Sequence, residues 1–199
     1  MWRDEYIRES CYQKSVVDLC CGTGWAGQLA LHLGAKSVKW LDSRSERFLF
    51  DRNKFTQHDV HDRKFMHTYL EDVNVILYMG HFYHTDQQEN ILQMFTDCPA
   101  QDLILESKVL SCMIGKNTQP LEHLHVDDVS VNWMASGREN LTVRQPNLAK
   151  TILLLEQSGW QIKNHSVIDE SYLTSPFYRD FKKSGPYYQF TVWASRDVV

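Results

Sequence analysis

Short apolar stretches alternate with amphipathic ones along this chain, the pattern of a protein in which helices cover a β-sheet. The apolar stretches predict strands at residues 16–17, 37–41, 55–60, 73–78 and 103–110. The stretches between and before them predict helices at residues 3–12, 25–33, 45–54, 63–70 and 86–95, the last with Thr85 or Asp86 as its N-cap. Residues 73–78 are apolar almost throughout, as expected of a parallel strand that is covered on both faces.

The last third of the chain departs from this alternation. Residues 111–145 are mostly polar, and they predict an insertion or lid over the C-terminal edge of the sheet. Pro146 then opens an amphipathic helix that ends before Gly159. Residues 161–168 and 187–194 alternate as strands do, and no helix separates them. They therefore predict an antiparallel pair of strands.

Residues 15–42 form a strand, a turn of small residues, a helix and a second strand. In the turn, Gly22 and Gly24 can take positive φ and let a ligand approach the backbone closely. The start of the following helix presents backbone N–H groups to ligand oxygens. The first strand ends on Asp18, and Asp42 follows the turn by about 20 residues, the distance at which a carboxylate meets ribose hydroxyls. This unit predicts a site for a ribose-bearing cofactor.

The sign of the charge at this turn selects among such cofactors. Gly22, Gly24 and Gly27 fit the dinucleotide fingerprint G-x-G-x-x-G, a weak signal when it stands alone. Asp18 would face the pyrophosphate of a dinucleotide, and like charges in one site are unfavourable. S-adenosylmethionine (SAM) has no phosphate and carries a sulfonium and an α-ammonium group. We therefore expect SAM, with S-adenosylhomocysteine (SAH) as product, rather than NAD.

Residues 16–24, Val-Val-Asp-Leu-Cys-Cys-Gly-Thr-Gly, resemble motif I of class I SAM-dependent methyltransferases. The family usually has glycine where Cys20 stands, a departure that adds strain unless Cys20 keeps a φ open to L-residues. Residues 78–84, Tyr-Met-Gly-His-Phe-Tyr-His, look like the Gly-x-x-Tyr-His segment of the branch that contains the tRNA uridine-34 carboxymethyltransferase and its small-molecule methyltransferase relatives. Residues 103–110 and 145–160 are similar to that branch's fifth strand and later helix.

The resemblance covers residues 15–110 and 145–195 and implies a fold. It implies a Rossmann-like three-layer α/β/α sandwich with a mostly parallel seven-stranded sheet of order 3-2-1-4-5-7-6, whose last strand is antiparallel. The length of 199 residues suits a single domain, residues 1–199, with residues 1–14 as a lead-in. The implied activity is methyl transfer from SAM to an oxygen or nitrogen of a small-molecule or nucleoside acceptor.

The candidate site residues follow the ends of the expected strands. Those expected to bind the cofactor are Asp18, Cys20, Gly22, Thr23, Gly24, Asp42, Ser43, Asp59, Val60, Tyr78 and Met79. In methyltransferases an acid after the third strand commonly receives the exocyclic amine of adenine; Asp59 is the candidate here and Asp62 its alternative. The expected catalytic residues are His84, Tyr83, His81 and Glu106. Of these, His84 is ranked first as the general base.

In the resembled branch, the tyrosine that matches Tyr83 helps basic residues to hold a carboxylated SAM derivative. Before motif I this chain has only Arg3, Arg8 and Lys14, and Gln189 lies near the start of its last strand. Without the cations, a second carboxylate would be poorly compensated. Ordinary SAM is therefore expected.

Composition and charge bear on the possible partners, compartment and ligands of the protein. The net charge of −4 disfavours RNA as a partner, although a tRNA wobble uridine stays an alternative acceptor. Five cysteines without a C-x-x-C pair predict reduced thiols in a cytoplasmic protein. No apolar run or signal peptide suggests a membrane or export, and the histidine pairs lack the spacing of a metal site. A homodimer or a partner subunit remains open, as does a regulatory SAM-binding subunit without catalysis.

Overall fold

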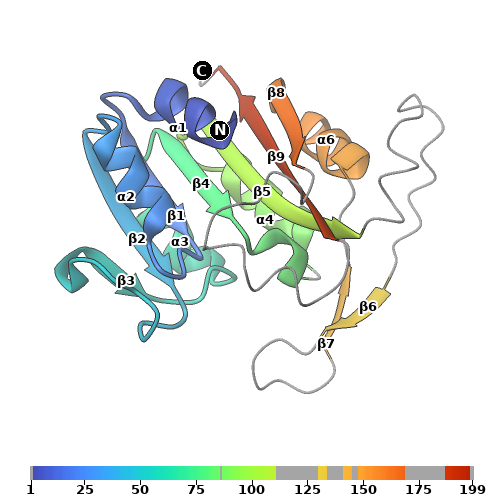
Figure 1. Cartoon of the computed structure of the whole chain (residues 1–199), viewed down its shortest axis with the longest axis horizontal. Helices are drawn as coiled ribbons and strands as arrows, with labels where there is room; N and C mark the ends of the chain where they lie inside the picture. Colours follow the sequence, from blue (N-terminus) through green and yellow to red (C-terminus); the bar gives the residue numbers. More distant parts are fainter. Residues whose placement is uncertain are drawn as a thin grey trace.

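A seven-stranded sheet forms the middle layer of the computed structural model, which describes residues 2–85, 87–110, 130–133, 141–144, 148–168 and 187–197 (Figure 1). Its strands are β1 (Ser15–Leu19), β2 (Ser37–Asp42), β3 (Phe55–Gln57), β4 (Val75–Met79), β5 (Asp102–Leu110), β8 (Gln161–Ile168) and β9 (Tyr187–Ser195). Their order is β3-β2-β1-β4-β5-β9-β8. The first five run parallel, and β9 is antiparallel to both β5 and β8. The predicted order and the predicted antiparallel pair are confirmed.

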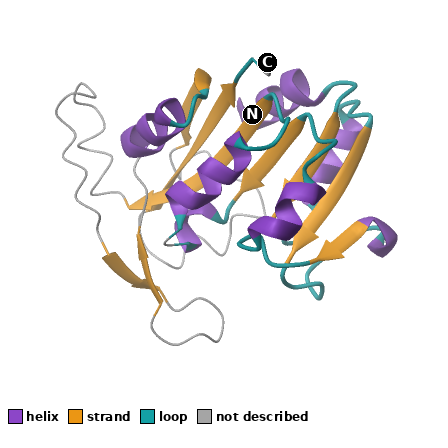
Figure 2. Cartoon of the chain, turned by 180° about the vertical axis from the view of Figure 1, so that it is seen from behind, coloured by secondary structure: helices purple, strands orange, loops and turns teal. Residues whose placement is uncertain are grey.

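Helices cover both faces of this sheet, as the view from behind also shows (Figure 2). One face packs against α1 (Trp2–Cys11) and α2 (Trp25–His32). The other packs against α3 (Arg63–Tyr69), α4 (Gln88–Thr96) and α6 (Leu148–Gln157). The described part of the chain is therefore the expected α/β/α sandwich.

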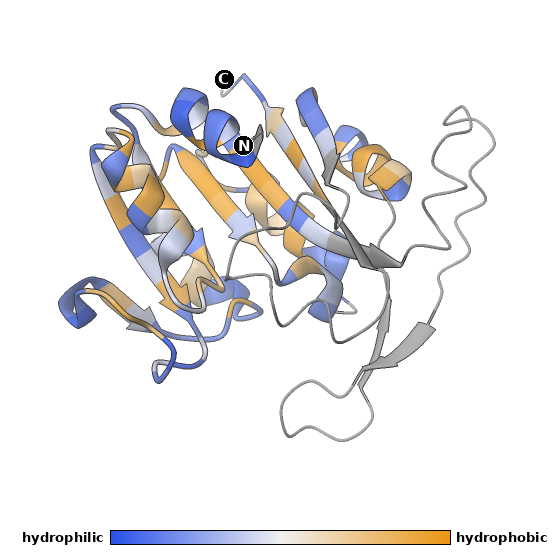
Figure 3. Ribbon diagram, viewed as in Figure 1, coloured by the Kyte–Doolittle hydropathy of each residue, from blue (hydrophilic) through white to orange (hydrophobic). Residues whose placement is uncertain are grey.

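Alternation along the strands divides the apolar side chains between these two layers. Val17 and Leu19 of β1 belong to the core on the α3 and α4 side, whereas Val16 belongs to the core on the α1 and α2 side. Because successive side chains of a strand point to opposite faces, Asp18 shares the α2 side with Val16. The apolar colour in Figure 3 follows β4 and the beginning of β5, which are buried on both faces.

The prediction of a helix at residues 45–54 is wrong. This segment is a loop that ends in a single 3₁₀ turn, η1 (Arg52–Lys54). Phe48 is buried, Leu49 is 64% exposed and Phe50 is half-buried, so the chain alternates as an extended segment does. The Phe48 ring packs 5.7 Å from the Trp40 ring. This packing against distant aromatic residues outweighs the local helical preference.

The end of β3 and the start of α4 also differ from the prediction. The third strand ends at Gln57, because Asp59 accepts a hydrogen bond from the backbone N–H of His61 (3.0 Å) and turns the chain. Helix α4 begins at Gln88 and has no side-chain cap. The hydroxyl of Thr85 instead accepts from the backbone N–H of Gln87 (3.0 Å), ahead of the helix, and residue 86 lies outside the described residues.

The expected insertion is described only in part. Strands β6 (Ser130–Trp133) and β7 (Leu141–Arg144) pair antiparallel, and β7 lies beside η2 (Phe82–His84). The other residues of 111–145 lie outside the described part of the chain, so its role as a lid stays a prediction. Among the described helices, none is long and apolar enough to cross a membrane.

Candidate active site

The predicted site residues gather where the parallel strands end. Asp18 is the penultimate residue of β1, Asp42 is the last of β2, and Met79 is the last of β4. Met79 pairs with Glu106 of β5 in the sheet register. Strand ends at one edge of an open α/β sheet are where such folds bind ligands.

The carboxylate of Asp18 caps helix α2. It is 1% exposed, and its Oδ2 accepts a hydrogen bond from the backbone N–H of Gly27 (2.8 Å), the third residue of that helix. Burial raises the pKa of Asp18 to about 7, and the negative charge of Asp42 adds to this rise, against the opposing effect of the Gly27 hydrogen bond. Asp18 therefore carries a proton part of the time at neutral pH, and a nearby cation would favour its ionised form.

Asp42 holds the glycine turn against the end of β2. Its Oδ2 accepts from the backbone N–H of Gly22 (2.9 Å), and its Oδ1 accepts from the backbone N–H of Arg44 (2.9 Å). The side chain is nearly buried at 5% exposure. Because each carboxylate oxygen can accept more than one hydrogen bond, Asp42 can still receive the two hydroxyls of a ribose.

The glycine turn has the backbone that a close ligand requires. Gly22 and Gly24 both have positive φ, of 54° and 85°. No atom lies within 4 Å of the place where a Cβ on Gly22 would stand, so the turn borders open space there. Cys20 also has a positive φ, of 53°, so the departure from the family's glycine carries backbone strain.

Four other predicted contacts are placed mainly by their backbone or by apolar packing. The carbonyl of Thr23 accepts from the backbone N–H of Leu49 (3.3 Å), which ties the loop after β2 to the glycine turn. Ser43 is exposed, Val60 is buried in the core beside α3, and Met79 is half-buried.

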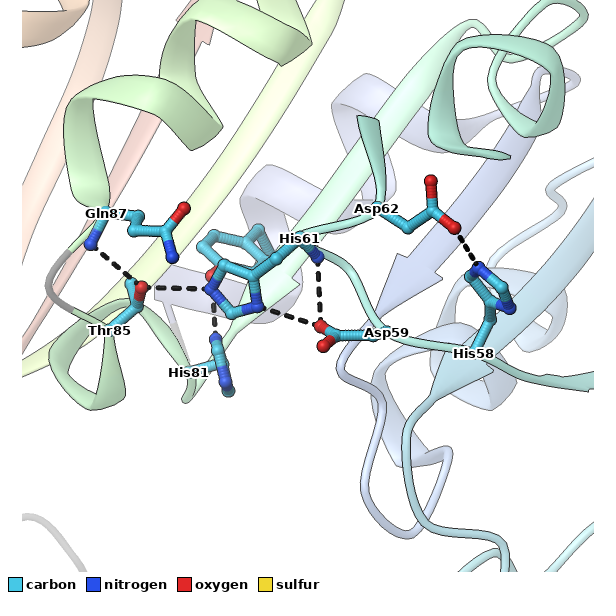
Figure 4. Close-up of polar contacts among 8 residues, drawn as sticks. His58, Asp59, His61, Asp62, His81, Thr85 and Gln87 are labelled. Atoms are coloured by element: carbon cyan, nitrogen blue, oxygen red, sulfur yellow. Dashed lines mark hydrogen bonds and ion pairs between the residues drawn. The ribbon is translucent and has the colours of Figure 1, made fainter. Parts of the chain in front are cut away.

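Asp59 and its alternative Asp62 have different surroundings (Figure 4). Asp59 Oδ1 accepts from the backbone N–H of His61 and lies 2.8 Å from His61 Nδ1. Partial burial opposes ionisation, but these two hydrogen bonds and the charge of His61 hold the pKa of Asp59 below its usual range. Asp62 caps α3 through the backbone N–H of Phe65 (3.1 Å) and lies 3.0 Å from His58 Nε2.

Tyr78 in β4 and His81 in the segment after it form a hydrogen-bonded pair. Tyr78 is fully buried, with its ring edge-on to Phe95, and its hydroxyl lies 2.7 Å from His81 Nδ1. Burial, with the positive charge of His61, lowers the pKa of His81 to about 4. At neutral pH the His81 ring is therefore neutral, and its Nδ1 shares a hydrogen bond with the Tyr78 hydroxyl. A base of such low pKa is weak.

Tyr83, His84 and Glu106 lie close to this pair. The rings of Tyr83 and His84 are 4.1 Å apart in η2, and the His84 ring is 6.0 Å from that of His81. Burial and the charge of Glu106 raise the pKa of Tyr83. Glu106 is 5% exposed, and its Oε2 lies 3.6 Å from Arg3 Nη1 of helix α1. The structure thus brings the four candidate catalytic residues together.

Sequence reasoning did not assign a site role to Arg3, His61 or Thr85. Arg3 reaches Glu106 from the N-terminal helix, and His61 lies 3.0 Å from the Thr85 hydroxyl. The short spacing Asp59-x-His61 could have suggested a contact between those two residues, whereas the partners Glu106 and Thr85 are far from Arg3 and His61 in the sequence.

One surface cavity lies away from the predicted site residues. It has a volume of about 390 Å³ and lies between α3 and α4, lined among others by Arg63, Lys64, His67 and Met94, and none of the predicted site residues line it. The described residues contain no group of three or more His, Cys, Asp or Glu side chains that could hold a metal ion.

Comparison with known proteins shows which solved structures share this fold. No family model and no curated protein matches the sequence. A SAM-dependent methyltransferase from Mesorhizobium loti is similar in structure, with 14% identity, a TM-score of 0.66, and coverage of 97% of this chain and 95% of that one. The magnesium protoporphyrin IX methyltransferase of Synechocystis, with bound SAH, has 14% identity, a TM-score of 0.60, and coverage of 98% and 82%.

A third similar structure belongs to a complex that contains the Haloferax volcanii Trm112 methyltransferase activator. It shares 13% identity with this chain at a TM-score of 0.61, over 100% of this chain and 90% of that one. Identities this low establish a shared architecture and leave the chemistry to the site itself. The chain therefore has the fold of these SAM-dependent methyltransferases.

Proposed function

We propose that this protein is a SAM-dependent methyltransferase that acts on an oxygen or nitrogen of a small-molecule or nucleoside acceptor. The observation that carries this proposal is the pair of nearly buried carboxylates, Asp18 and Asp42, beside a glycine turn that borders open space at Gly22. A cation at this place would be matched by both acids. A pyrophosphate would be repelled by them.

Acidic residues at or after successive strand ends match successive parts of SAM. Asp18 would balance the positively charged methionine end, and Asp42 would accept the ribose hydroxyls. Asp59 would accept the exocyclic amine of adenine, since Asp62 already caps α3. Tyr78 and Met79 would line the site through backbone and apolar contact, next to Gly80, where a Cβ would also meet open space.

SAM supplies a methyl group bonded to a positively charged sulfur, which an acceptor attacks in line. The contribution of the chain is to hold the acceptor at near-attack distance, which can supply several kcal/mol of the barrier. An acceptor of high pKa must also lose a proton to a nearby base. The low pKa of His81 and the ion pair of Glu106 with Arg3 make both poorer bases. These properties support His84 as the first candidate.

The carboxymethyltransferase branch is a narrower proposal, with less support. Of the basic residues before motif I, Arg3 lies 3.6 Å from Glu106, which matches its charge. Lys14 donates a hydrogen bond to Asp102 (2.7 Å), the first residue of β5. Neither cation is left to balance a second carboxylate on the cofactor, so ordinary SAM is the better candidate.

Calorimetry with SAM, SAH and NAD tests the cofactor. We expect SAM and SAH to bind and NAD not to bind. Asp42→Ala should weaken SAM binding by at least about tenfold, because a buried acceptor for the ribose is lost. Asp51→Ala, which changes an exposed acid that caps η1, is the matched control and should bind SAM as the unmodified protein does. Binding of NAD in preference to SAM would overturn the proposal.

Methyl transfer is tested separately from binding. Transfer of labelled methyl groups to small-molecule and nucleoside acceptors should be lowered by His84→Gln while SAM affinity is unchanged. The second candidate function is a SAM-binding subunit that needs a partner, which the similar activator complex favours. That function predicts SAM binding by the isolated chain, with transfer only after a partner subunit is added.

A further inference from the structure

His61 bridges the loop after β3 and the turn after β4 (Figure 4). Its Nδ1 lies 2.8 Å from Asp59 Oδ1, and its Nε2 lies 3.0 Å from the Thr85 hydroxyl. The backbone N–H of His61 donates to the same Asp59 oxygen (3.0 Å). One residue thus joins two segments that flank the candidate cofactor site.

In the neutral form of the His61 ring, the hydrogen-bond partners determine which nitrogen carries the proton. Asp59 can only accept, so His61 Nδ1 must donate to it. The Thr85 hydroxyl already accepts from the backbone N–H of Gln87 (3.0 Å), so its own proton is available to His61 Nε2. The ring therefore has a defined tautomer and a defined orientation, with Thr85, 3% exposed, as its buried anchor.

The Asp59 carboxylate is fixed by this arrangement through one oxygen only. Both contacts from His61 reach Oδ1, and among the described residues none donates a hydrogen bond to Oδ2. The side chain remains 67% exposed. The backbone N–H of His58, next to Asp59, bonds the carbonyl of Asp42 (3.1 Å), which places this loop beside the proposed ribose acid.

We propose that His61 is a positioning residue for adenine recognition: it orients Asp59 so that the second carboxylate oxygen accepts the exocyclic amine of the cofactor's adenine. This inference rests on the proposed function and deepens it. The amine selects adenosyl over inosyl ligands, because an inosine presents a carbonyl oxygen to the carboxylate in place of a donor. A carboxylate free to rotate would make this distinction less well.

A second histidine–aspartate pair in the same loop provides a matched control. His58 Nε2 lies 3.0 Å from Asp62 Oδ2, with 33% of its side chain exposed against 27% for His61. Among the hydrogen bonds of the described residues, this pair does not reach the turn after β4. It should therefore stabilise the loop locally without orienting Asp59.

The experiment compares the affinities of SAH and S-inosylhomocysteine by calorimetry in four proteins. The unmodified chain should prefer SAH by about tenfold or more, the range for a hydrogen bond to a charged group. His61→Gln extends toward Thr85 and removes the ring donor to Asp59, and it should reduce the preference to about threefold or less. His61→Asn places an amide donor where Nδ1 stands and should retain most of the preference. His58→Gln should leave the preference unchanged.

The outcomes separate this inference from the proposed function. If the unmodified chain binds neither ligand, the proposed function fails. If it prefers SAH and His61→Gln keeps the full preference, the positioning role is wrong while the cofactor assignment stands. Equal loss of preference in His61→Gln, His61→Asn and His58→Gln would also overturn the role, because it would reflect general loosening of the loop. Thermal unfolding of each variant checks that it is folded.

Discussion

Cys20 has a backbone φ of 53°, in the left-handed region that favours glycine. It stands in the glycine turn, where its side chain packs against the core on the α3 and α4 side. Burial, with the charges of Asp42, Asp18 and Asp59, raises the pKa of its thiol well above the usual value. The residue is therefore strained and unreactive, and its effect on the site is conformational.

Replacing Cys20 should reveal this strain. Cys20→Gly should be more stable than Cys20→Ala by about 1 kcal/mol, because only glycine adopts this φ without a penalty. Urea unfolding of both variants measures the difference. In helix α2 the preference is reversed: Ala30→Gly should lower the free energy of unfolding by about 1 kcal/mol. A Cys20→Ala variant as stable as Cys20→Gly would show that the turn is not strained.

If Asp18 lies beside the cationic end of the cofactor as proposed, cofactor binding should be coupled to proton release. The pKa of Asp18, about 7 in the unliganded chain, should fall when a cation binds beside it, because the cation favours the ionised form. SAM binding near pH 6.5 should therefore release protons, which appears as a dependence of the calorimetric enthalpy on the ionisation enthalpy of the buffer. Asp18→Asn keeps an oxygen for Gly27 but cannot titrate, so it should show no proton release. Equal release in both proteins would contradict this assignment.

The same pKa makes a prediction about stability. The folded-state pKa of Asp18 is raised, so its contribution to stability is fully present below its ordinary value near 4 and is lost as the pH rises through about 7. The lowered pKa of His81 acts oppositely, with stability lost as the pH falls from 6.5 toward 4. Asp18→Asn should therefore gain stability relative to the unmodified protein between pH 4 and pH 8. Both proteins contain His81, so the difference between their urea unfolding free energies at pH 4 and at pH 8 reports the effect of Asp18 alone.

At the scale of elements, the loop between β2 and β3 forms one wall of the glycine turn. Phe48 lies against the place where a Cβ on Gly24 would stand, 2.5 Å from its ring, and against the rings of Trp40 and Phe55. The backbone N–H of Leu49 bonds the carbonyl of Thr23. The loop is thus held by burial of alternate side chains, and the turn depends on it.

Neighbouring substitutions in this loop should differ sharply. Phe48→Ala should lower the free energy of unfolding by about 3 kcal/mol, since it removes a buried ring. Leu49→Ala changes a side chain that is 64% exposed and should stay within about 0.5 kcal/mol. Urea unfolding measures both effects. Similar effects of the two changes would indicate that the loop does not pack as an alternating segment.

At the scale of the molecule, Arg196 ties the end of the chain to the connection between α4 and β5. Its guanidinium donates to the carbonyls of Thr96, Cys98 and Ala100 and lies 4.8 Å from the centre of the Trp160 ring. A planar group with several donors suits this arrangement, which a single ammonium group cannot reproduce. The contact joins the antiparallel half of the sheet to the parallel half.

Arg196→Lys should therefore destabilise the protein by about 2 kcal/mol, as expected when hydrogen bonds from a charged group to partly buried carbonyls are lost. Arg63→Lys is the matched control, because Arg63 pairs with Asp97 at the surface (3.2 Å, side chains 60% and 48% exposed) and should change stability by about 0.5 kcal/mol or less. Thermal unfolding compares the two variants. Equal effects would mean that Arg196 contributes no more than a surface ion pair.

Sequence reasoning succeeds here where the signal is local. The strands around Val17 and Ile76, the glycine turn and the terminal antiparallel pair all follow from patterns a few residues long, and the structure confirms these elements. The helix prediction at residues 45–54 is wrong, because Phe48 packs against Trp40 and Phe55, contacts that the local pattern of apolar residues does not show.

By itself, the sequence determined the order of the elements, the apolar faces and the positions of Asp18 and Asp42 at strand ends, since each depends on neighbours along the chain. Only the tertiary structure decided that His61 meets Thr85, that Arg3 meets Glu106 and that the turn borders open space at Gly22. The two contacts join residues far apart in the sequence. They and the open space at Gly22 depend on how the sheet, its loops and its helices pack together.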